Sequence, residues 1–209
     1  MLHRSAILVV AAIVSAPAAA EVVSSSDSGF ALQSTASVPV APDVVWADLV
    51  APAKWWDPEH TWSGKASNLY LDPQATGCFC ELLGSGEPGS VDPGLVGPGR
   101  PRGSVEHLHI VHVLPGRLLR MTGGLGPLQS EPVGAVLTIA LESTGEGTRI
   151  RFEYKVSGLV TIKGGDIAPA VDGVLSAQLA RLAALPHGSA TAPTAAPAPG
   201  RDSGPENPR

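Results

Sequence analysis

Four side chains suited to holding a small molecule are concentrated in one short segment of this sequence. Trp55, Trp56, His60 and Trp62 fall within eight positions of a chain in which only 4% of residues are aromatic. A tryptophan offers broad apolar contact area and one N–H donor, and a histidine can donate or accept a hydrogen bond. The cluster predicts the mouth of a ligand pocket. The alternative is that the tryptophans close the open end of the hydrophobic core, because pocket walls and core overlap in such folds.

Two cysteines and two histidines are each spaced by two positions. In a strand this spacing puts Cys78 and Cys80 on one face, and His107 and His109 on one face. If the two strands pair with Cys80 opposite His107 and Cys78 opposite His109, the four side chains form a Cys2His2 set of the kind that binds zinc. A one-residue slip in register breaks this set. A disulfide is a second alternative, but we predict buried free thiols and no metal.

Several acidic and histidine side chains are candidates for acid–base chemistry. A catalytic pair must converge in space and carry a shifted pKa, and sequence spacing predicts neither property. No nucleophile elbow, phosphate-binding glycine loop or His-Glu-x-x-His motif is present. We therefore assign no catalytic residue, and whether the chain is an enzyme stays open. The candidates are Glu81, Glu106, His107, His112 and Asp172.

Residues 1–20 have the pattern of a cleavable secretory signal. A basic start at Arg4 precedes an uncharged apolar run from Ala6 to Ala16, and small residues at Ala18 and Ala20 form a signal-peptidase pattern. The apolar run is shorter than the roughly 20 residues that a transmembrane helix needs. We expect export to the periplasm or the exterior, without a membrane span.

The remainder of the chain has the length of one domain. We expect a linker at residues 21–27, a domain at 28–185 with a Gly/Pro-rich loop at 84–103, and a disordered Ala/Pro-rich tail at 186–209. The 14 basic and 19 acidic residues form no basic face, so nucleic acid is not an expected partner. The oligomeric state is not predicted.

The elements that must position these side chains begin with a strand at residues 29–40. Two short helical segments follow, one from Pro42 and one over residues 53–56. Gly/Pro-rich turns then separate a run of segments typical of antiparallel strands, and residues 148–156 alternate apolar and polar side chains most regularly. These strand segments are residues 68–71, 77–83, 104–114, 117–122, 134–141 and 148–156.

One long amphipathic helix closes the predicted domain. We expect Asp166 as its N-cap, an apolar stripe at helical spacing, and an end before Pro186. Gln178 lies within the stripe, where a polar group needs a buried partner or a cavity. Strands in series followed by one long helix predict an α+β fold, with a curved antiparallel sheet around that helix.

The order of these elements, together with short motifs, resembles the START-like (SRPBCC) superfamily, whose helix-grip fold is that of the Bet v 1 relatives. The similarity is to its branch of activator of Hsp90 ATPase homologues and polyketide cyclase/dehydrase-like proteins, and it covers residues 28–185. The motifs are Val44-Val45-Trp46, Pro52-Ala-Lys-Trp-Trp56, Gly77-Cys-Phe-Cys-Glu81, Val105-Glu-His107, Pro115-Gly-Arg-Leu-Leu119 and Gly124-Leu-Gly-Pro-Leu-Gln129.

This resemblance implies a cavity between sheet and C-terminal helix that takes apolar or amphipathic small molecules without a cofactor. The expected function is therefore binding of such a molecule, with a cyclase-, dehydratase- or hydrolase-like enzyme and a protein-interaction module as alternatives. The predicted export argues against an Hsp90 co-chaperone. The expected ligand-binding residues are Trp55, Trp56, His60, Trp62, Phe79, Glu81, His107 and Gln178.

Overall fold

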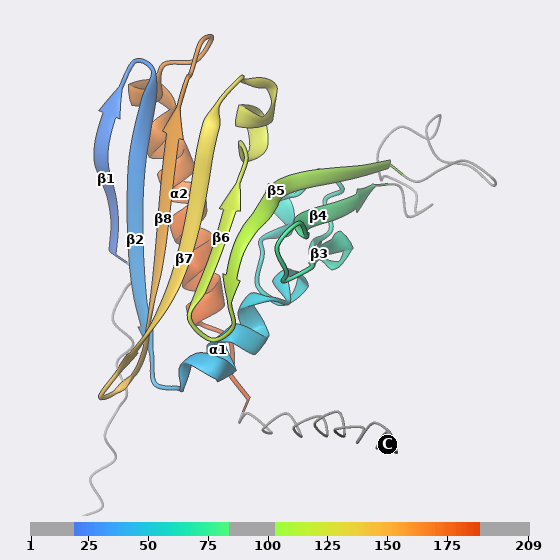
Figure 1. Ribbon diagram of the computed structural model, residues 1–209, viewed down its shortest axis with the longest axis vertical. Helices are drawn as coiled ribbons and strands as arrows, with labels where there is room; N and C mark the ends of the chain where they lie inside the picture. Colours follow the sequence, from blue (N-terminus) through green and yellow to red (C-terminus); the bar gives the residue numbers. More distant parts are fainter. Residues whose placement is uncertain (1–18, 84–102, 189–209) are drawn as a thin grey trace, which may run out of the picture.

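The computed structural model describes residues 19–83 and 103–188 (Figure 1). The predicted signal up to residue 18, most of the predicted Gly/Pro-rich loop and the tail from residue 189 lie outside these ranges. All eight described strands join one antiparallel sheet in the order β1-β2-β8-β7-β6-β5-β4-β3. The strands are β1 (Ala19–Ser26), β2 (Gly29–Val38), β3 (Leu69–Leu71), β4 (Cys78–Leu83), β5 (Gly103–Leu114), β6 (Leu118–Thr122), β7 (Gly134–Thr144) and β8 (Gly147–Ser157).

The long C-terminal helix α2 (Gly164–Ala183) packs against β1, β2 and β8. The sheet curves, so that β5, β4 and β3 extend away from the part that α2 covers (Figure 1). The predicted α+β architecture, with a curved antiparallel sheet and a C-terminal helix, is confirmed. Side chains on one stripe of α2 are buried, among them Ala168, Leu175, Gln178, Leu179 and Leu182.

Short helices connect the strands. The predicted helix from Pro42 is α1 (Pro42–Leu49), and the segment predicted at residues 53–56 contains the 3₁₀ turn η1 (Pro52–Lys54). Proline occupies the first turn of both, where its missing N–H costs no hydrogen bond. Three further 3₁₀ turns were not predicted: η2 (Pro58–His60), η3 (Ala66–Asn68) and η4 (Gly126–Ser130).

The predicted linker at residues 21–27 is wrong, because most of it belongs to β1. This strand pairs antiparallel with β2, from Ala19 opposite Thr35 to Ser26 opposite Gly29. Val22 packs against the core, but three consecutive serines follow soon after, so the segment lacks the apolar alternation that predicts a strand. This strand forms because its main chain pairs with the edge of β2, and not because of its side-chain pattern.

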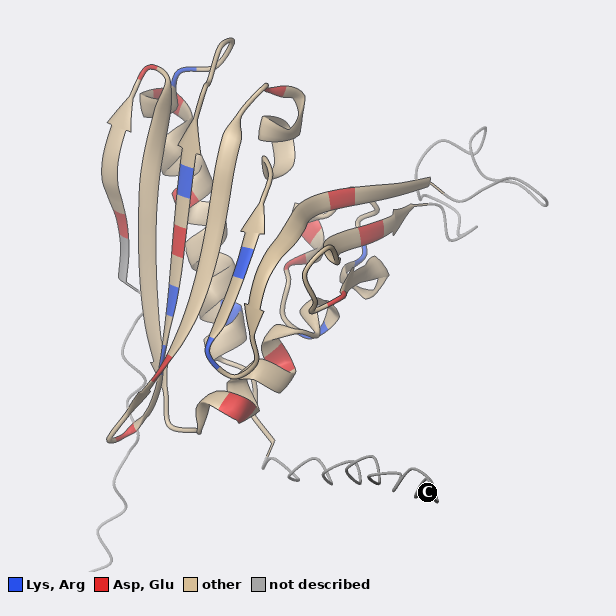
Figure 2. Ribbon diagram, in the orientation of Figure 1, with Lys and Arg blue, Asp and Glu red and all other residues tan. Residues whose placement is uncertain are grey.

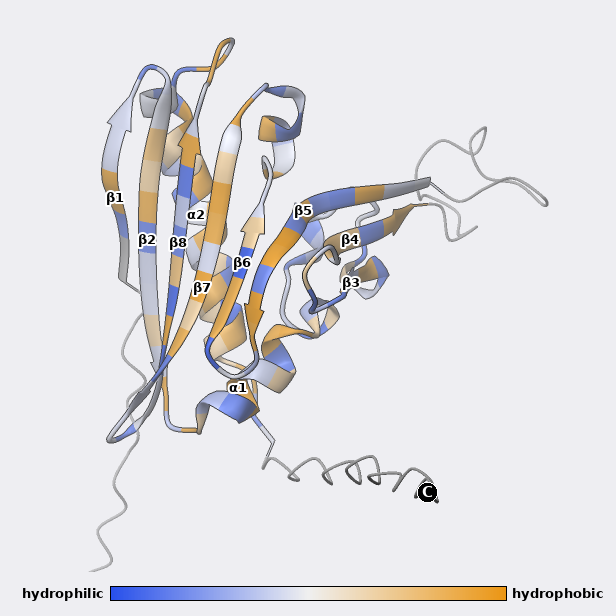
Figure 3. Ribbon diagram, in the orientation of Figure 1, coloured by the Kyte–Doolittle hydropathy of each residue, from blue (hydrophilic) through white to orange (hydrophobic). Residues whose placement is uncertain are grey.

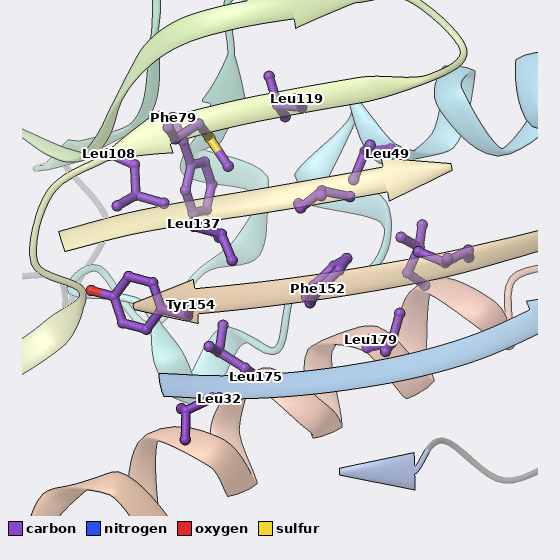
Figure 4. Close-up of a cluster of buried hydrophobic side chains, with 14 of the residues drawn as sticks. Leu32, Leu49, Phe79, Leu108, Leu119, Leu137, Phe152, Tyr154, Leu175 and Leu179 are labelled. Atoms are coloured by element: carbon purple, nitrogen blue, oxygen red, sulfur yellow. The ribbon is translucent and has the colours of Figure 1, made fainter. Parts of the chain in front are cut away.

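The core lies between the sheet and α2 (Figure 4). Residues Ile150, Phe152, Tyr154 and Val156 of β8 are buried while the positions between them are more exposed, which confirms the predicted alternation. Figure 3 shows hydrophilic and hydrophobic positions interleaved along this strand. Its outer face carries charged side chains of both signs (Figure 2), with Lys155 paired to Glu153 at 2.6 Å. One face of β8 therefore supports the core and the other faces water.

Asp166 is not the N-cap of α2. The helix begins at Gly164, after Lys163, and Asp166 lies in its first turn. The N–H of Gly164 donates to the carbonyl of Asp27. A Cβ at position 164 would lie 2.4 Å from the carbonyl oxygen of Ser26, so only glycine allows this close approach. Packing against the β1–β2 turn, and not a side-chain cap, fixes the start of the helix.

The predicted disordered tail begins too early at residue 186. His187 follows α2 closely, its side chain is only 5% exposed, and its Nδ1 lies 2.9 Å from Oδ2 of Asp48 on α1. Lys54 donates to the other oxygen of the same carboxylate at 2.8 Å. The hydrogen bonds to Lys54 and His187 outweigh the effect of burial and lower the pKa of Asp48. The chain after α2 is thus attached to α1.

Candidate functional site

A cavity of about 420 Å³ lies beside the N-terminal half of α2. Its other walls come from the η2 segment, from the loop that leads into η4, and from His107 on β5. Five apolar side chains of α2 form one wall, and they offer no hydrogen bond. The lining residues are Trp56, Glu59, His60, Thr61, Trp62, His107, Leu125, Gly126, Pro127, Ile167, Ala170, Val171, Val174 and Leu175.

The structure brings four of the predicted site residues to this cavity. Trp56, His60, Trp62 and His107 all line it. Trp62 keeps 55% of its side chain exposed, whereas Trp56 and His107 are buried. The indole nitrogen of Trp56 donates to the carbonyl of His60 at 3.0 Å, which fixes the turn between them. The tryptophan-rich segment therefore forms part of the cavity wall.

Trp55 and Phe79 lie behind the wall and do not line the cavity. Trp55 is buried in the core, where its indole N–H donates to the carbonyl of Asp48 at 3.1 Å. Phe79 packs between Trp56 and His107, with ring centroids 4.9 and 5.0 Å apart respectively. For Trp55, core packing was the correct alternative. Phe79 orients two lining residues instead of forming the lining itself.

Glu81 and His107 form a buried acid–base pair. Nε2 of His107 lies 2.9 Å from Oε2 of Glu81. Glu81 is 0% exposed and His107 is 6% exposed. The carboxylate also accepts backbone N–H bonds from Trp62 at 3.0 Å and from Ser63 at 2.6 Å. One carboxylate thus holds both β5 and the loop that carries Trp62.

Both members of the pair have pKa values shifted downward. Burial raises the pKa of Glu81, but hydrogen bonds from Ser63, Trp62 and His107 outweigh it and hold the pKa below its usual value. Burial lowers the pKa of His107, and the attraction of Glu81 only partly offsets this effect. At neutral pH the pair is therefore a carboxylate hydrogen-bonded to a neutral imidazole.

Gln178 lies behind the cavity and is 0% exposed. Its Oε1 accepts the backbone N–H of Asp57 at 2.8 Å, and its Nε2 lies 3.2 Å from Nδ1 of His60. Of the two alternatives for this polar residue, a hydrogen-bond partner or a cavity, the structure shows a hydrogen-bond partner. Its partner is the segment that carries His60, so Gln178 positions a lining residue and does not itself line the cavity.

The loop before η4 supplies lining residues that the sequence did not predict. The hydroxyl of Tyr154 donates to the carbonyl of Gly123 at 3.0 Å and accepts the N–H of Leu125 at 3.1 Å. Desolvation raises the pKa of Tyr154 to about 12, so the hydroxyl stays protonated. A buried strand residue therefore fixes the loop that carries Leu125, Gly126 and Pro127.

Cys78 and Cys80 are joined by a disulfide, so the prediction of free thiols is wrong. Cys78 is opposite His109, as the zinc hypothesis requires. A shift in register then places Glu106 opposite Cys80, where that hypothesis had placed His107. No group of three or more metal-ligating side chains occurs in the described residues.

The remaining acid–base candidates do not reach the cavity lining. Nδ1 of His109 lies 2.9 Å from Oε1 of Glu106 at an exposed position. His112 is exposed. Burial raises the pKa of Asp172, whose Oδ1 is buried without a partner among the described residues. Of the five candidates, Glu81 and His107 alone converge.

The fold and the cavity together define an α+β protein with a cavity beside its C-terminal helix. No family model and no curated protein matches the chain. Protein CV1439 from Chromobacterium violaceum is 17% identical, with a TM-score of 0.48 over 76% of this chain and 98% of its own. CalU16 from Micromonospora echinospora is 14% identical, with a TM-score of 0.46 over 74% of this chain and 73% of its own. Similarities at this level assign neither a family nor an activity.

None of the described helices has the length and apolar content needed to cross a bilayer.

Proposed function

We propose that this chain is a START-like (SRPBCC) helix-grip protein that binds a small apolar or amphipathic molecule in the cavity beside α2. The cavity carries the proposal. Its volume of about 420 Å³ falls in the usual range of roughly 300–1,000 Å³ for small-molecule sites. An apolar wall interrupted by a few placed polar groups is also typical of such sites.

The polar groups of the cavity are held in place before any ligand arrives. Glu81 and Gln178 are fully buried and hydrogen-bond the two histidines of the lining. Tyr154 fixes the opposite loop. Preorganisation of this kind lowers the cost of binding, because few side chains must be ordered when the ligand enters.

A cavity-filling substitution tests the proposal. Val174 of α2 lines the cavity, whereas Ala177 on the same helix is exposed and does not. We expect Val174→Trp to abolish uptake of an apolar fluorescent dye and to remove any ligand seen by native mass spectrometry of the freshly purified protein. Ala177→Trp serves as the matched control and should leave both unchanged. Equal dye binding by both variants and the wild type would exclude this cavity as the site.

We also propose that the chain is exported, with its first 20 residues removed. Cleavage after Ala20 would leave Glu21–Ser26 of β1 available to pair with β2. The disulfide between Cys78 and Cys80 fits an oxidising compartment. The N-terminal residue of the protein recovered from the periplasm or medium, measured by mass spectrometry, tests this. A mature chain that retains residues 1–20 in the cytoplasm would contradict it.

The Glu81–His107 pair favours an acid–base enzyme as a second candidate function. A neutral imidazole oriented by a carboxylate can accept a proton from a bound molecule, and the resulting imidazolium is stabilised by that carboxylate. His107→Phe should then abolish turnover while cavity binding persists. Full activity in this variant would remove the proposed role.

A further inference from the structure

The hydrogen bond to Glu81 fixes which ring nitrogen of His107 carries the proton. A carboxylate can only accept, so the proton lies on Nε2. In the neutral ring Nδ1 then carries a lone pair. Nδ1 of His107 makes no hydrogen bond to the described residues. It is also not among their fully buried atoms that lack a partner, so it keeps some accessible surface. His107 lines this cavity and also a second hollow formed by residues 104–109, 122–124 and 129. We place Nδ1 on the side of the cavity beside α2, which then receives an acceptor at this point.

The contact with Gln178 makes Nδ1 of His60 an acceptor from the protein, whereas in His107 it is Nε2 that is bound to the protein, as a donor. Oε1 of Gln178 accepts the N–H of Asp57, so the group facing Nδ1 of His60 is the amide NH2, which only donates. Nδ1 of His60 therefore accepts, and in the neutral ring the proton lies on Nε2. His60 is exposed and also lines the cavity. At this second point the cavity offers a donor.

The charges around the cavity oppose an anionic ligand. The described lining contains Glu59 but no lysine or arginine. Directly behind His107 lies the carboxylate of Glu81, fully buried and already accepting hydrogen bonds from Trp62, Ser63 and His107. A ligand carboxylate at His107 would approach this negative charge without a compensating cation, which is costly in an apolar site.

We infer that the cavity selects a neutral apolar molecule that carries a hydroxyl or N–H donor for Nδ1 of His107 and a carbonyl or ether acceptor for Nε2–H of His60. The inference rests on the proposed binding function and deepens it to a ligand class. Two buried residues, Glu81 and Gln178, determine which ligands are preferred, because they make one histidine an acceptor and the other a donor toward the cavity. Neither residue needs to contact the ligand.

A set of naphthalenes of similar size tests the selection. Isothermal titration at neutral pH compares 6-hydroxy-2-acetonaphthone, which has both groups, with 1-naphthol, 1-methoxynaphthalene, naphthalene and 1-naphthoate. We expect the first to bind most tightly, each missing hydrogen bond to weaken binding about 3- to 10-fold, and naphthoate to bind most weakly. Equal affinity of naphthol and naphthalene would overturn the role of His107.

Paired variants assign the donor preference to one histidine. His107→Phe should abolish the advantage of 1-naphthol over naphthalene, whatever the change in naphthalene affinity itself. His109→Phe, at an exposed histidine on the same strand that does not line the cavity, is the control and should retain the full advantage. An unchanged preference in His107→Phe would contradict the inference.

The wild-type protein alone gives a second readout that does not depend on variant folding. Two-bond 1H–15N correlation spectra at neutral pH report the protonated nitrogen of each histidine. We expect Nε2–H for both His107 and His60, and Nδ1–H at either position would overturn the assignment there. If no naphthalene binds at all, the binding function itself fails. If all bind equally, that function stands and the selection fails.

Discussion

The half of the sheet made of β2, β8 and β7 is more regular than the half made of β4, β5 and β6, and β1 at the edge has one register shift of its own, between Val22 and Ser24. Strands β2, β8 and β7 pair without interruption, from Gly29 opposite Ser157 to Thr144 opposite Gly147. Strands β4, β5 and β6 contain two shifts of register, between Phe79 and Cys80 and between Ile110 and His112. Buried side chains on β8 are apolar except at Thr148, whose hydroxyl donates to the carbonyl of Val40, and at Tyr154, whose hydroxyl makes two hydrogen bonds. The irregular half instead buries Glu81 and His107.

This difference shows how a single sheet can support both a core and a site. A register shift turns side chains relative to the regular pleat and is frequent next to functional sites. Leu108 and His107 are adjacent in sequence and both are buried, which unbroken alternation would not allow. We expect the regular half to provide the stability that lets the other half hold a buried carboxylate.

The largest effect is expected in the regular half. Phe152→Ala removes a fully enclosed ring from β8, and we expect the free energy of unfolding to fall by about 3–5 kcal/mol. Lys155→Ala, on the exposed face of the same strand, should change it by less than about 0.5 kcal/mol. Urea denaturation measures both. A loss below 1 kcal/mol for Phe152→Ala would show that this half is not the stable one.

The irregular half should be sensitive to a change of one atom. Glu81→Gln places an amide NH2 where an oxygen accepts from Trp62, Ser63 or His107, so one donor loses its partner. We expect a loss of about 1–3 kcal/mol in urea denaturation. Glu106→Gln, at an exposed pair on β5, should lose at most about 1 kcal/mol. Equal losses would mean that burial of Glu81 has no energetic consequence.

Tyr154 connects the two halves, and its hydroxyl can be removed alone. Tyr154→Phe leaves the N–H of Leu125 and the carbonyl of Gly123 without this partner. We expect about 1–2 kcal/mol less stability and weaker dye binding, because the loop at the cavity is no longer fixed. Unchanged dye binding with reduced stability would show that Tyr154 contributes to stability and not to binding.

Acidification should destabilise the protein through the irregular half. The pKa of His107 is lower in the folded chain than its usual 6.5, so the unfolded chain binds more protons and stability falls as pH drops below 6.5. The lowered pKa of Glu81 adds a further loss below its usual value of 4.5, and the lowered pKa of Asp48, which lies on α1 outside this half, adds one below 3.8. Urea midpoints between pH 7.5 and pH 4 measure this. In His107→Gln the loss between pH 6.5 and pH 5 should shrink, and an unchanged curve would assign it elsewhere.

The smallest effect is expected from the disulfide. Cys78 and Cys80 are separated by only two positions, and the stabilisation that a disulfide gives by restricting the unfolded chain is smallest for short loops. We expect the double change of both cysteines to serine to cost about 1 kcal/mol or less. A much larger loss in thermal denaturation would show that the bridge maintains the register shift beside it.

The regular half could be predicted from the sequence because its signals are local. Alternation along β8 and the helical stripe of α2 follow from residue types at fixed spacing. The segment of β1 has no such pattern, since its serines gain their structure from main-chain pairing with β2. The N-cap at Asp166 was mistaken because contact with Asp27, far away in sequence, fixes the start of α2.

The site could be predicted only in part. The tryptophan-rich segment identified one wall of the cavity, and the polar position of Gln178 indicated a buried partner. The pairing of Glu81 with His107 could not be predicted, because it depends on a register shift between Phe79 and Cys80 for which residues 78–81 contain no sequence signal. Leu125 and Pro127 were missed for a related reason: their position depends on the hydrogen bond that the N–H of Leu125 donates to Tyr154, which lies 29 residues away in sequence.

The attachment of His187 to Asp48 has a practical consequence for handling the protein. The cavity lies along residues 167–175, in the N-terminal half of α2, whereas the chain leaves the described domain beside α1, at the other end of that helix (Figure 1). A tag or surface linkage placed directly after Gly188 would therefore orient the molecule with its cavity away from the support. Immobilised protein should remain open to small molecules flowing past it.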